Sequence, residues 1–370
     1  MKTQKRQLAI FLATSGHSGV DRVMNNLMGE FAARGIAVDL LRIANHGPYL
    51  EAPLPGMRFV ELGSSHVNSS LPPLVRYLKR ERPRALLTDK DRVNRLALWA
   101  RRLAGVSTRV VVRIGTTVSK NLERRSPWAR WSQYNSMRWF YPWADAIIVP
   151  SQGAARDLAN ISGIPLDRIR VVPNPIVTPA LFKLAELRST QEGLAPDHQP
   201  VILGVGELSA RKGFTTLIKA FSKVRQSRPC RLLILGEGRQ RSRLEALIAQ
   251  LGLEDDVEMP GFVKNPYAYM AKADLLVVSS DCEGFGNVLA EALAVGLPVV
   301  STDCPSGPRE ILQDGRFGPL IPVGDVHALA RAMLATLDNP MDAELLRSAA
   351  KPFSVAASAS QYLAALGFSR

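Results

Sequence analysis

Short apolar segments alternate with longer amphipathic stretches along most of this chain, and this alternation constrains its fold more than any other feature. The apolar segments are rich in Val, Leu and Ile and have the length of buried strands, whereas the stretches between them have helical spacing. Such an order predicts an α/β architecture of parallel sheets covered by helices. The strand candidates are LAIFLAT, AVDLLRI, ALLTD, RVVVRIG and AIIVPS in the first half and PVILGVG, CRLLILG, VEMPG, LLVVSS and PVVST in the second.

A segment with five prolines separates the two sets of strands and predicts a domain boundary. A chain of 370 residues exceeds what one hydrophobic core usually organises. We therefore expect a first domain over residues 1–175, a linker over 176–199 and a second domain over 200–352. Each half is compatible with a doubly wound, Rossmann-like sheet, and two such domains would face a cleft. Ligands of these sheets bind beyond the carboxyl ends of the strands.

The N-terminal sequence and the cysteines favour a protein of the cytoplasm. The apolar part of MKTQKRQLAIFLATSG covers only Leu8 to Ala13, which suits a first strand better than a signal peptide. No apolar run approaches the roughly 20 residues of a membrane span. The three cysteines, Cys230, Cys282 and Cys304, lack metal-ligand spacing and are expected as free thiols.

The stretch DCEGFGNVLAE, residues 281–291, predicts a ligand site at a strand-to-helix turn. Gly284 and Gly286 lie in the turn, and the amides of Phe285 to Val288 would be free to bind an anion at the helix start. Glu283 and Glu291 would repel a phosphate, but carboxylates suit the hydroxyls of a sugar. Alternatively, Glu283 only favours the helix dipole and Glu291 is a surface residue.

Two other turns also follow predicted strands. Arg211 and Lys212 stand together in GELSARKGF, where a guanidinium and an ammonium could hold a diphosphate and stabilise it as a leaving group. A solvated basic pair is the alternative. Gly16 and Gly19 follow the first strand and would allow close backbone approach to a ligand, although the third glycine of a dinucleotide fingerprint is missing.

Taken together, these motifs resemble the retaining glycosyltransferases of the GT-B fold, in the large fourth family that uses nucleotide sugars. The resemblance spans nearly the whole chain and is carried by two glutamates with seven residues between them, by Arg211–Lys212, by GFV at 261–263 and by VVPNP at 171–175. It implies that a C-terminal helix, at about 353–370, packs back on the first domain.

The resemblance also implies roles for individual residues. Glu283 would hold donor-sugar hydroxyls, Glu291 the ribose hydroxyls, and Arg211 with Lys212 the diphosphate. The remaining contacts would come from the loop at Gly284, Phe285, Gly286, Asn287 and Val288, from Phe262 and Val263 at the base, and from Gly16 and Gly19 at the donor phosphates and acceptor.

The expected reaction moves a hexose-type sugar from a nucleotide diphosphate sugar, UDP or else GDP, with retention and without a metal or cofactor. The acceptor would be a glycan or a lipid-linked molecule of envelope polysaccharide or lipopolysaccharide synthesis. Many relatives carry a first-domain histidine that this sequence lacks at the comparable strand ends. The candidates for acceptor contacts are His17, Asp89, Lys90, Arg113 and Thr116. Asp89-Lys90-Asp91 also spells the D-x-D of metal-nucleotide sites, an alternative that the flanking arginines disfavour.

The positive charge is confined to the first half of the chain. Residues 1–180 contain 27 Lys and Arg against 12 Asp and Glu, whereas the remainder contains 20 against 21. All five tryptophans lie between Trp99 and Trp143, and residues 120–143 mix four of them with arginines. This composition favours an anionic inner-membrane surface as a partner, unless the tryptophans pack inward. The sequence lacks the recognition motifs of nucleic-acid-binding proteins, which disfavours that alternative. A GT-B-fold epimerase is the nearest enzymatic alternative.

Overall fold

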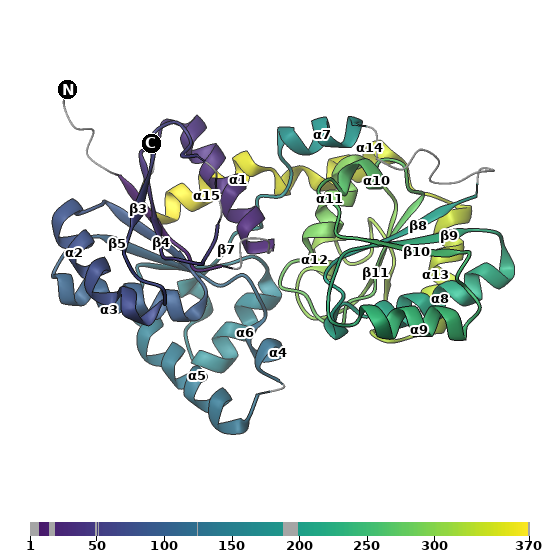
Figure 1. The fold of residues 1–370 in the computed structure, drawn as a ribbon, viewed down its shortest axis with the longest axis horizontal. Coiled ribbons are helices and arrows are strands. Elements are labelled where there is room, and N and C mark those ends of the chain that lie inside the picture. The colour runs from purple at the N-terminus through teal and green to yellow at the C-terminus, as the bar shows by residue number, and fades with distance from the viewer. Residues whose placement is uncertain are drawn as a thin grey trace. The chain divides into compact units, whose positions relative to one another are not determined.

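The chain folds into two units, each with its own apolar core (Figure 1). The computed structural model describes residues 7–14, 19–48, 50, 52–123, 125–187 and 199–368. Unit 1 takes in the described residues of Met1–Pro175 and Val355–Arg370, and unit 2 those of Ile176–Ser354.

Unit 1 is built on a seven-stranded parallel sheet of order β3-β2-β1-β4-β5-β6-β7. The strands are added outward in one direction from β1 and in the opposite direction from β4. The boundary between β1 and β4 is therefore the switch point of a doubly wound fold. The strands are β1 Leu8–Phe11, β2 Val38–Arg42, β3 Met57–Glu61, β4 Ala85–Asp89, β5 Arg109–Arg113, β6 Ala146–Val149 and β7 Ile169–Val171.

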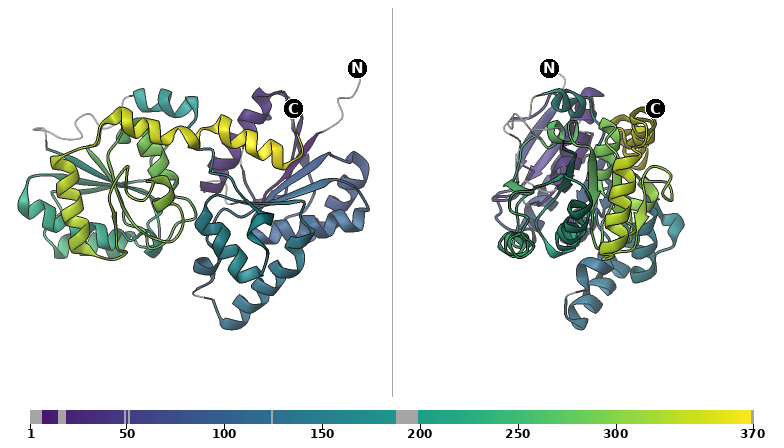
Figure 2. Two further views of the ribbon diagram at one scale, coloured as in Figure 1. Left: turned by 180° about the vertical axis from the view of Figure 1, so that it is seen from behind. Right: turned by 90° about the vertical axis from the view of Figure 1, so that its right-hand side faces the viewer.

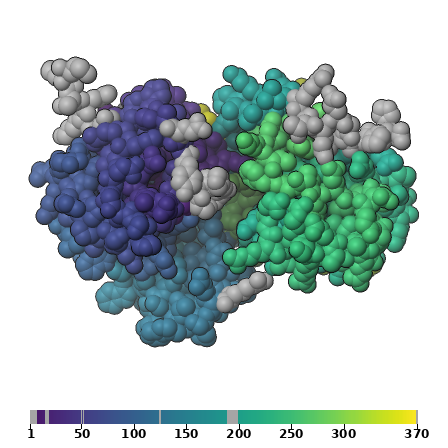
Figure 3. All heavy atoms as spheres, in the orientation of Figure 1, coloured from purple at the N-terminus to yellow at the C-terminus, as the bar shows by residue number. Residues whose placement is uncertain are grey.

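The helices of unit 1 connect these strands and cover both faces of the sheet. They are α1 Gly19–Ala33, α2 Leu71–Glu81, α3 Asp91–Ala104, α4 Val118–Leu122, α5 Pro127–Phe140 and α6 Gln152–Ser162, with short 3₁₀ turns η1 Asn68–Ser70, η2 Tyr141–Trp143 and η3 Leu166–Arg168. The α5 helix lies at the margin of unit 1, away from the middle of its sheet (Figures 1 and 3).

The last helix, α15 Val355–Ala365, belongs to unit 1 and lies beside α1 (Figure 2). Arg34 donates hydrogen bonds to the Ala356 carbonyl and the Ser360 hydroxyl at 2.8 and 2.9 Å. Arg109 donates to the Ala365 carbonyl at 2.7 Å. The C-terminal segment is thus fixed to the domain in which the chain begins, as the resemblance implies.

Unit 2 contains a six-stranded parallel sheet of order β10-β9-β8-β11-β12-β13, with its switch point between β8 and β11. Its strands are β8 Val201–Val205, β9 Arg231–Leu235, β10 Val257–Gly261, β11 Leu275–Val278, β12 Val299–Thr302 and β13 Leu320–Ile321. Its helices are α7 Pro179–Glu186, α8 Phe214–Ser227, α9 Arg241–Gln250, α10 Tyr267–Met270, α11 Asn287–Val295, α12 Pro308–Ile311, α13 Val326–Asp338 and α14 Ala343–Ala350, with 3₁₀ turns η5 Ala210–Lys212 and η6 Lys351–Phe353.

Every strand that the sequence predicts is present, and the prediction of two doubly wound Rossmann-like domains is confirmed. Three strands lack a continuous apolar run and were not predicted, namely β3, β7 and β13. All three are outermost strands, which pair on one side only and therefore need less apolar sequence.

The first part of the linker expected over 176–199 forms a helix, α7. Thr178 caps α7 by accepting a hydrogen bond from the Leu181 amide, and Pro179 occupies the first helical position, where its missing N–H costs nothing. Leu181 is buried, so this helix is packed as part of unit 2. Residues 188–198 of the predicted linker lie outside the described residues.

Candidate donor-sugar site

Two loops meet at the switch point of unit 2, and they carry the residues that the sequence singled out. The loop after β8 contains Arg211 and Lys212, and the loop after β11 contains Glu283. Because β8 and β11 are hydrogen-bonded neighbours, both loops leave the same edge of the sheet side by side. This is the edge at which doubly wound sheets bind their ligands.

Gly213 lets the two loops come into contact. Its φ is +64°, and a Cβ there would lie 2.0 Å from the Ser279 carbonyl oxygen. The Ser279 hydroxyl donates to the Lys212 carbonyl at 3.0 Å, and the Asp281 amide donates to the Arg211 carbonyl at 2.8 Å. Any larger residue at 213 would force the Arg211–Lys212 turn away from the end of β11.

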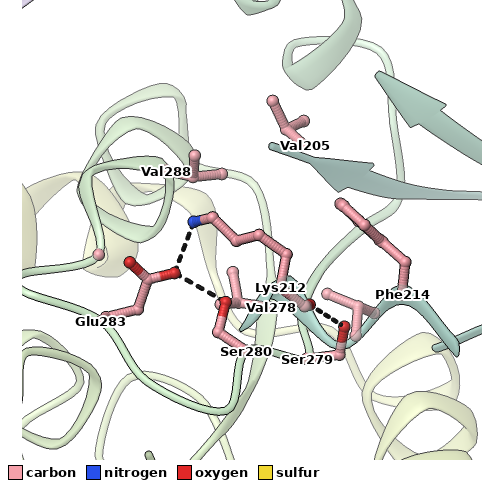
Figure 4. Close-up of a pocket in the computed structure, with 10 residues that line it drawn as sticks. Val205, Lys212, Phe214, Val278, Ser279, Ser280, Glu283 and Val288 are labelled. Atoms are coloured by element: carbon pink, nitrogen blue, oxygen red, sulfur yellow. Dashed lines mark hydrogen bonds and ion pairs between the residues drawn. The ribbon is translucent and has the colours of Figure 1, made fainter. Parts of the chain in front are cut away.

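Glu283 lies at the centre of the site and is bound by both cations. Figure 4 shows its contacts with Lys212 and Ser280. The Lys212 ammonium is 2.6 Å from Glu283 Oε1, and Arg211 Nη1 is 3.5 Å from Oε2. The Ser280 hydroxyl donates to Oε1 at 2.7 Å. The small pocket around them is also lined by Val205, Phe214, Gly286 and Val288.

These contacts keep Glu283 ionised although it is buried. Burial by itself raises the pKa of Glu283, but the charges of Lys212 and Arg211 and the hydrogen bonds from Lys212 and Ser280 outweigh it, so the pKa lies below the ordinary value of 4.5. The site therefore presents a fixed carboxylate between two cations. It can accept hydrogen bonds from hydroxyls, and the cations can stabilise an added negative charge.

The α11 helix begins at this pocket. Gly286 is its N-cap with a φ of +98°, a left-handed conformation in which glycine costs nothing. The first turn of a helix offers amide groups and the positive end of the helix dipole, which favour an anion near Asn287 and Val288. Phe285 packs edge-on against Phe353 at 5.4 Å between ring centroids, so that its side chain anchors the loop. Gly284 is buried beside it.

Glu291 occupies a different environment from Glu283. It lies one turn inside α11, is 0 % exposed, and accepts a hydrogen bond from the Tyr267 hydroxyl at 3.4 Å. The alternative that Glu291 is a surface residue is therefore wrong. Its role toward ribose hydroxyls stays a prediction, since the residue does not line the pocket that contains Glu283.

Phe262 and Val263, the predicted neighbours of the base, follow β10. Phe262 is 66 % exposed and Val263 is half-buried, so the Phe262 ring is accessible. A Cβ at Gly261, just before them, would lie 2.6 Å from a carboxylate oxygen of Glu237, and Glu237 pairs with Arg241 at 3.0 Å. The structure thus adds a charged pair beside the predicted base-binding loop.

The candidates in unit 1 are divided by the structure into buried and exposed ones. Asp89 and Arg113 are both 1 % exposed and form an ion pair with each other. Arg113 also donates to the Asn174 amide oxygen at 2.6 Å and to the Tyr362 hydroxyl at 2.9 Å.

The prediction that the Asp89 and Arg113 side chains contact the acceptor is therefore corrected, because their polar groups join β4 and β5 to α15. Burial lowers the pKa of Arg113, but the interactions with Asp89 and Tyr362 raise it by more. The pKa of Arg113 therefore lies above its ordinary value, and the guanidinium stays charged. Lys90 and Thr116 are exposed at the ends of β4 and β5 and stay candidates.

The predicted glycine loop is described only at Gly19, the exposed first residue of α1. Gly16 and His17 lie outside the described residues. In the D-x-D stretch, Asp91 pairs with Arg95 at 2.9 Å and accepts a hydrogen bond from Tyr141, while Asp89 pairs with Arg113. Both carboxylates are thus bound by arginines, and the part of the chain that the structure describes holds no cluster of three metal-ligating side chains.

Ser280 is a site residue that the sequence argument missed. It lies two residues after β11, and its carbonyl accepts a hydrogen bond from the Thr302 hydroxyl at 2.6 Å, which fixes the backbone beneath the pocket. Its position at the end of the predicted strand LLVVSS was the available signal. Tyr267, which contacts Glu291, gave none, because it lies in a short helix without a distinct pattern.

Comparisons with known proteins agree with this geometry. The family model described as "Glycosyl transferases group 1" matches residues 187–352, and that described as "Glycosyl transferase 4-like domain" matches residues 18–175. A curated protein of Campylobacter jejuni is 31% identical over 353 residues, covering 90% of this chain and 91% of its own length. It is named N-acetylgalactosamine-N,N'-diacetylbacillosaminyl-diphospho-undecaprenol 4-alpha-N-acetylgalactosaminyltransferase. The chain belongs to the group 1 glycosyltransferases.

A second curated glycosyltransferase is similar to this chain over a shorter length. The lipopolysaccharide core biosynthesis glycosyltransferase LpsE of Rhizobium meliloti is 30% identical over 205 residues, covering 55% of this chain and 57% of LpsE. About half of this glycosyltransferase is thus similar to an enzyme named for lipopolysaccharide core biosynthesis.

Solved structures confirm the GT-B fold of this glycosyltransferase. The apo form of the lipopolysaccharide outer core galactosyltransferase WaaB aligns with a TM-score of 0.75 at 20% identity, covering 98% of this chain and 99% of WaaB. Anabaena HepE in complex with UDP and glucose aligns with a TM-score of 0.78 at 20% identity, covering 97% of this chain and 99% of HepE.

Proposed function

We propose that this glycosyltransferase moves a hexose-type sugar from UDP to a glycan or lipid-linked acceptor in envelope polysaccharide or lipopolysaccharide synthesis, with retention at the anomeric carbon. The observation that carries the proposal is the buried, ionised Glu283 held between Lys212 and Arg211 at the start of α11. The diphosphate and the sugar are adjacent parts of a nucleotide-sugar donor. In this site the cations Lys212 and Arg211, which suit a diphosphate, lie next to the carboxylate of Glu283, which suits sugar hydroxyls.

The role of the two cations follows from their charge and placement. Lys212 and Arg211 would bind the diphosphate and neutralise the negative charge that grows on it as the glycosidic bond breaks. Two fixed cations can supply the neutralisation that other enzymes obtain from a metal ion, so we propose metal-independent transfer. The leaving diphosphate is stabilised, and positioning of the acceptor hydroxyl supplies much of the remaining acceleration.

Glu283 would bind and orient the donor sugar. Its two oxygens already accept hydrogen bonds and ion pairs from Lys212, Arg211 and Ser280, and its lowered pKa keeps it from serving as an acid near neutral pH. Sugar hydroxyls would share these oxygens. In the proposed reaction the acceptor hydroxyl attacks from the leaving-group face, a donor phosphate oxygen takes its proton, and Glu283 forms no covalent bond.

The donor and acceptor classes rest on relatives. The HepE structures contain UDP with glucose and UDP-glucose. The Campylobacter relative is named for an α-linkage and for a diphospho-undecaprenol acceptor. An α-linked product from an α-linked UDP-sugar requires retention, so a similar reaction here would be retaining.

The test is a panel of UDP- and GDP-sugars, assayed for hydrolysis and then for transfer in the presence of envelope lipid extracts, with and without EDTA. We expect hydrolysis of one UDP-sugar, faster release of UDP when the extract is added, and no effect of EDTA. The product linkage, determined by NMR, is expected to be α. The absence of turnover with every nucleotide sugar would refute the proposal.

A further inference from the structure

The three tryptophans of α5 lie on the exposed side of the helix, where a globular protein rarely places large apolar side chains. Trp128, Trp131 and Trp139 are 70 %, 57 % and 72 % exposed, whereas Met137 is its one buried residue. At 100° per residue the three indoles fall on one face, and Met137 points to the opposite side, toward the domain. The alternative that these tryptophans pack inward is therefore wrong.

This face is a concentrated apolar surface. Among the described residues of unit 1, the exposed large apolar side chains are Trp99, Leu103, Trp128, Trp131, Trp139 and Leu166, and half of them lie on α5. Trp128 and Trp131 stack on each other with centroids 4.9 Å apart at 22°. Trp139 lies about two turns further along the same face. Exposed apolar groups that gather on one face mark interaction sites in soluble proteins.

The helix that carries the indoles is firmly attached at its C-terminal end. Phe140 packs against Trp143 and Trp99 with ring centroids 5.0 and 5.9 Å apart, and Arg102 lies 3.7 Å above the Trp143 ring. At its N-terminal end the Ser126 hydroxyl accepts a hydrogen bond from the Ala129 amide. The exposed indoles thus belong to an element that is fixed at both ends, and Figure 1 shows this helix, α5, at the margin of the unit.

The charges around α5 indicate which partner suits this face. Residues 120–143 contain five Lys and Arg and one Glu, and exposed Arg125 and Arg138 lie on or next to the helix. The apolar surface of a protein partner would suit the tryptophans, but it would leave the positive charge of the arginines without a counterpart. Indoles at headgroup depth, with cations beside them, are the combination that binds an anionic bilayer.

We propose that the outer face of α5, formed by Trp128, Trp131 and Trp139 and flanked by Arg125 and Arg138, docks on the surface of an anionic lipid bilayer. The indoles enter the headgroup region and the arginines contact lipid phosphates. No helix in the described ranges has the length and apolar character to cross a bilayer, so this contact is a peripheral one. It would bring the glycosyltransferase to the surface at which a lipid-linked acceptor resides, and in this respect it rests on the proposed function.

The experiment measures binding to vesicles that contain neither donor nor acceptor. The full chain is sedimented with equimolar phosphatidylglycerol and phosphatidylcholine, or with phosphatidylcholine alone. We compare the wild type with the triple variant Trp128→Ala, Trp131→Ala, Trp139→Ala and with the double variant Arg125→Glu, Arg138→Glu. The matched controls are Leu166→Ala, an exposed apolar residue of the same unit, and Arg76→Glu with Arg80→Glu, two exposed arginines on α2.

The wild type and both controls are expected to bind the anionic vesicles equally, while the triple variant and the Arg125/Arg138 variant lose about tenfold or more in partition coefficient. Wild-type tryptophan emission should shift to the blue on binding and be quenched by brominated lipid. Equal binding of the triple variant, equal binding of both vesicle types, or association of the protein with itself through this face would overturn the proposal. Each variant keeps the donor site of unit 2, so hydrolysis of the nucleotide sugar serves as the folding control and tests the proposed function separately.

Discussion

Removing the ammonium of Lys212 should destabilise unit 2 in a pH-dependent way, because Lys212 neutralises a buried carboxylate. The side chains of Lys212 and Glu283 are 15 % and 8 % exposed, and the two groups are 2.6 Å apart. Removing one partner of a buried pair costs about 3–5 kcal/mol. Arg211 at 3.5 Å and the Ser280 hydroxyl remain in place, so we expect Lys212→Met to lower the free energy of unfolding by about 2–3 kcal/mol at pH 7.5.

The pH dependence follows from the pKa of Glu283. In the wild type this pKa lies below its ordinary value, so Glu283 contributes stability above that value and loses it as the pH falls through the lowered pKa. Without Lys212 the effect of burial prevails and the pKa of Glu283 rises. Protonation then relieves the buried charge, and the difference between the variant and the wild type should shrink as the pH falls from 8 toward about 5.

The assay is urea unfolding followed by far-UV circular dichroism, because all five tryptophans belong to unit 1 and their fluorescence does not report on unit 2. Lys219→Met removes the same charge from an exposed position on α8 and should change stability by less than about 0.5 kcal/mol. The double variant Lys212→Met, Glu283→Gln should be more stable than Lys212→Met alone by about 1 kcal/mol or more. A pH-independent loss, or a double variant no more stable than the single one, would refute this reasoning.

Three further predictions concern other parts of the two units. Arg211→Ala, at a 39 % exposed side chain, should lower turnover at saturating donor by about 10²–10³-fold while changing the melting temperature little, and wild-type turnover would contradict the leaving-group role. Gly213→Ala should lower the free energy of unfolding by about 1–2 kcal/mol or more, since its Cβ would lie 2.0 Å from the Ser279 oxygen, and an unchanged urea midpoint would show that the two loops can separate. Arg113→Met should cost unit 1 about 3–5 kcal/mol by leaving Asp89 buried without its cation, measured by tryptophan fluorescence; a loss below about 1 kcal/mol would mean that water reaches Asp89.

The sequence predicted the interior of each sheet and the donor loops because their signals are local. Runs such as LLVV at 275–278 are buried on both faces and contain few polar residues, and the loops at 211–212 and 283–288 directly follow such runs. The edge strand β3, with the sequence MRFVE, has its apolar residues interrupted by Arg58 and ended by Glu61, and it pairs on one side only. It therefore gave no comparable pattern.

The remaining errors concern contacts between residues that are distant in sequence. The sequence placed Asp89 and Arg113 at strand ends. It could not show that the Arg113 guanidinium would donate a hydrogen bond to Tyr362, which is 249 residues away. Likewise the tryptophans of α5 have helical spacing whether they face the domain or solvent. Only the packing of Met137 against the domain decides between these orientations.

The central claim is that Arg211 and Lys212 bind the donor diphosphate while Glu283 binds its sugar, and a crystal structure with a non-hydrolysable UDP-sugar tests it most directly. We predict the two phosphates within hydrogen-bonding distance of Arg211 and Lys212, and a Glu283 oxygen on a sugar hydroxyl. A donor whose diphosphate contacts neither cation, or whose sugar points away from Glu283, would contradict the account.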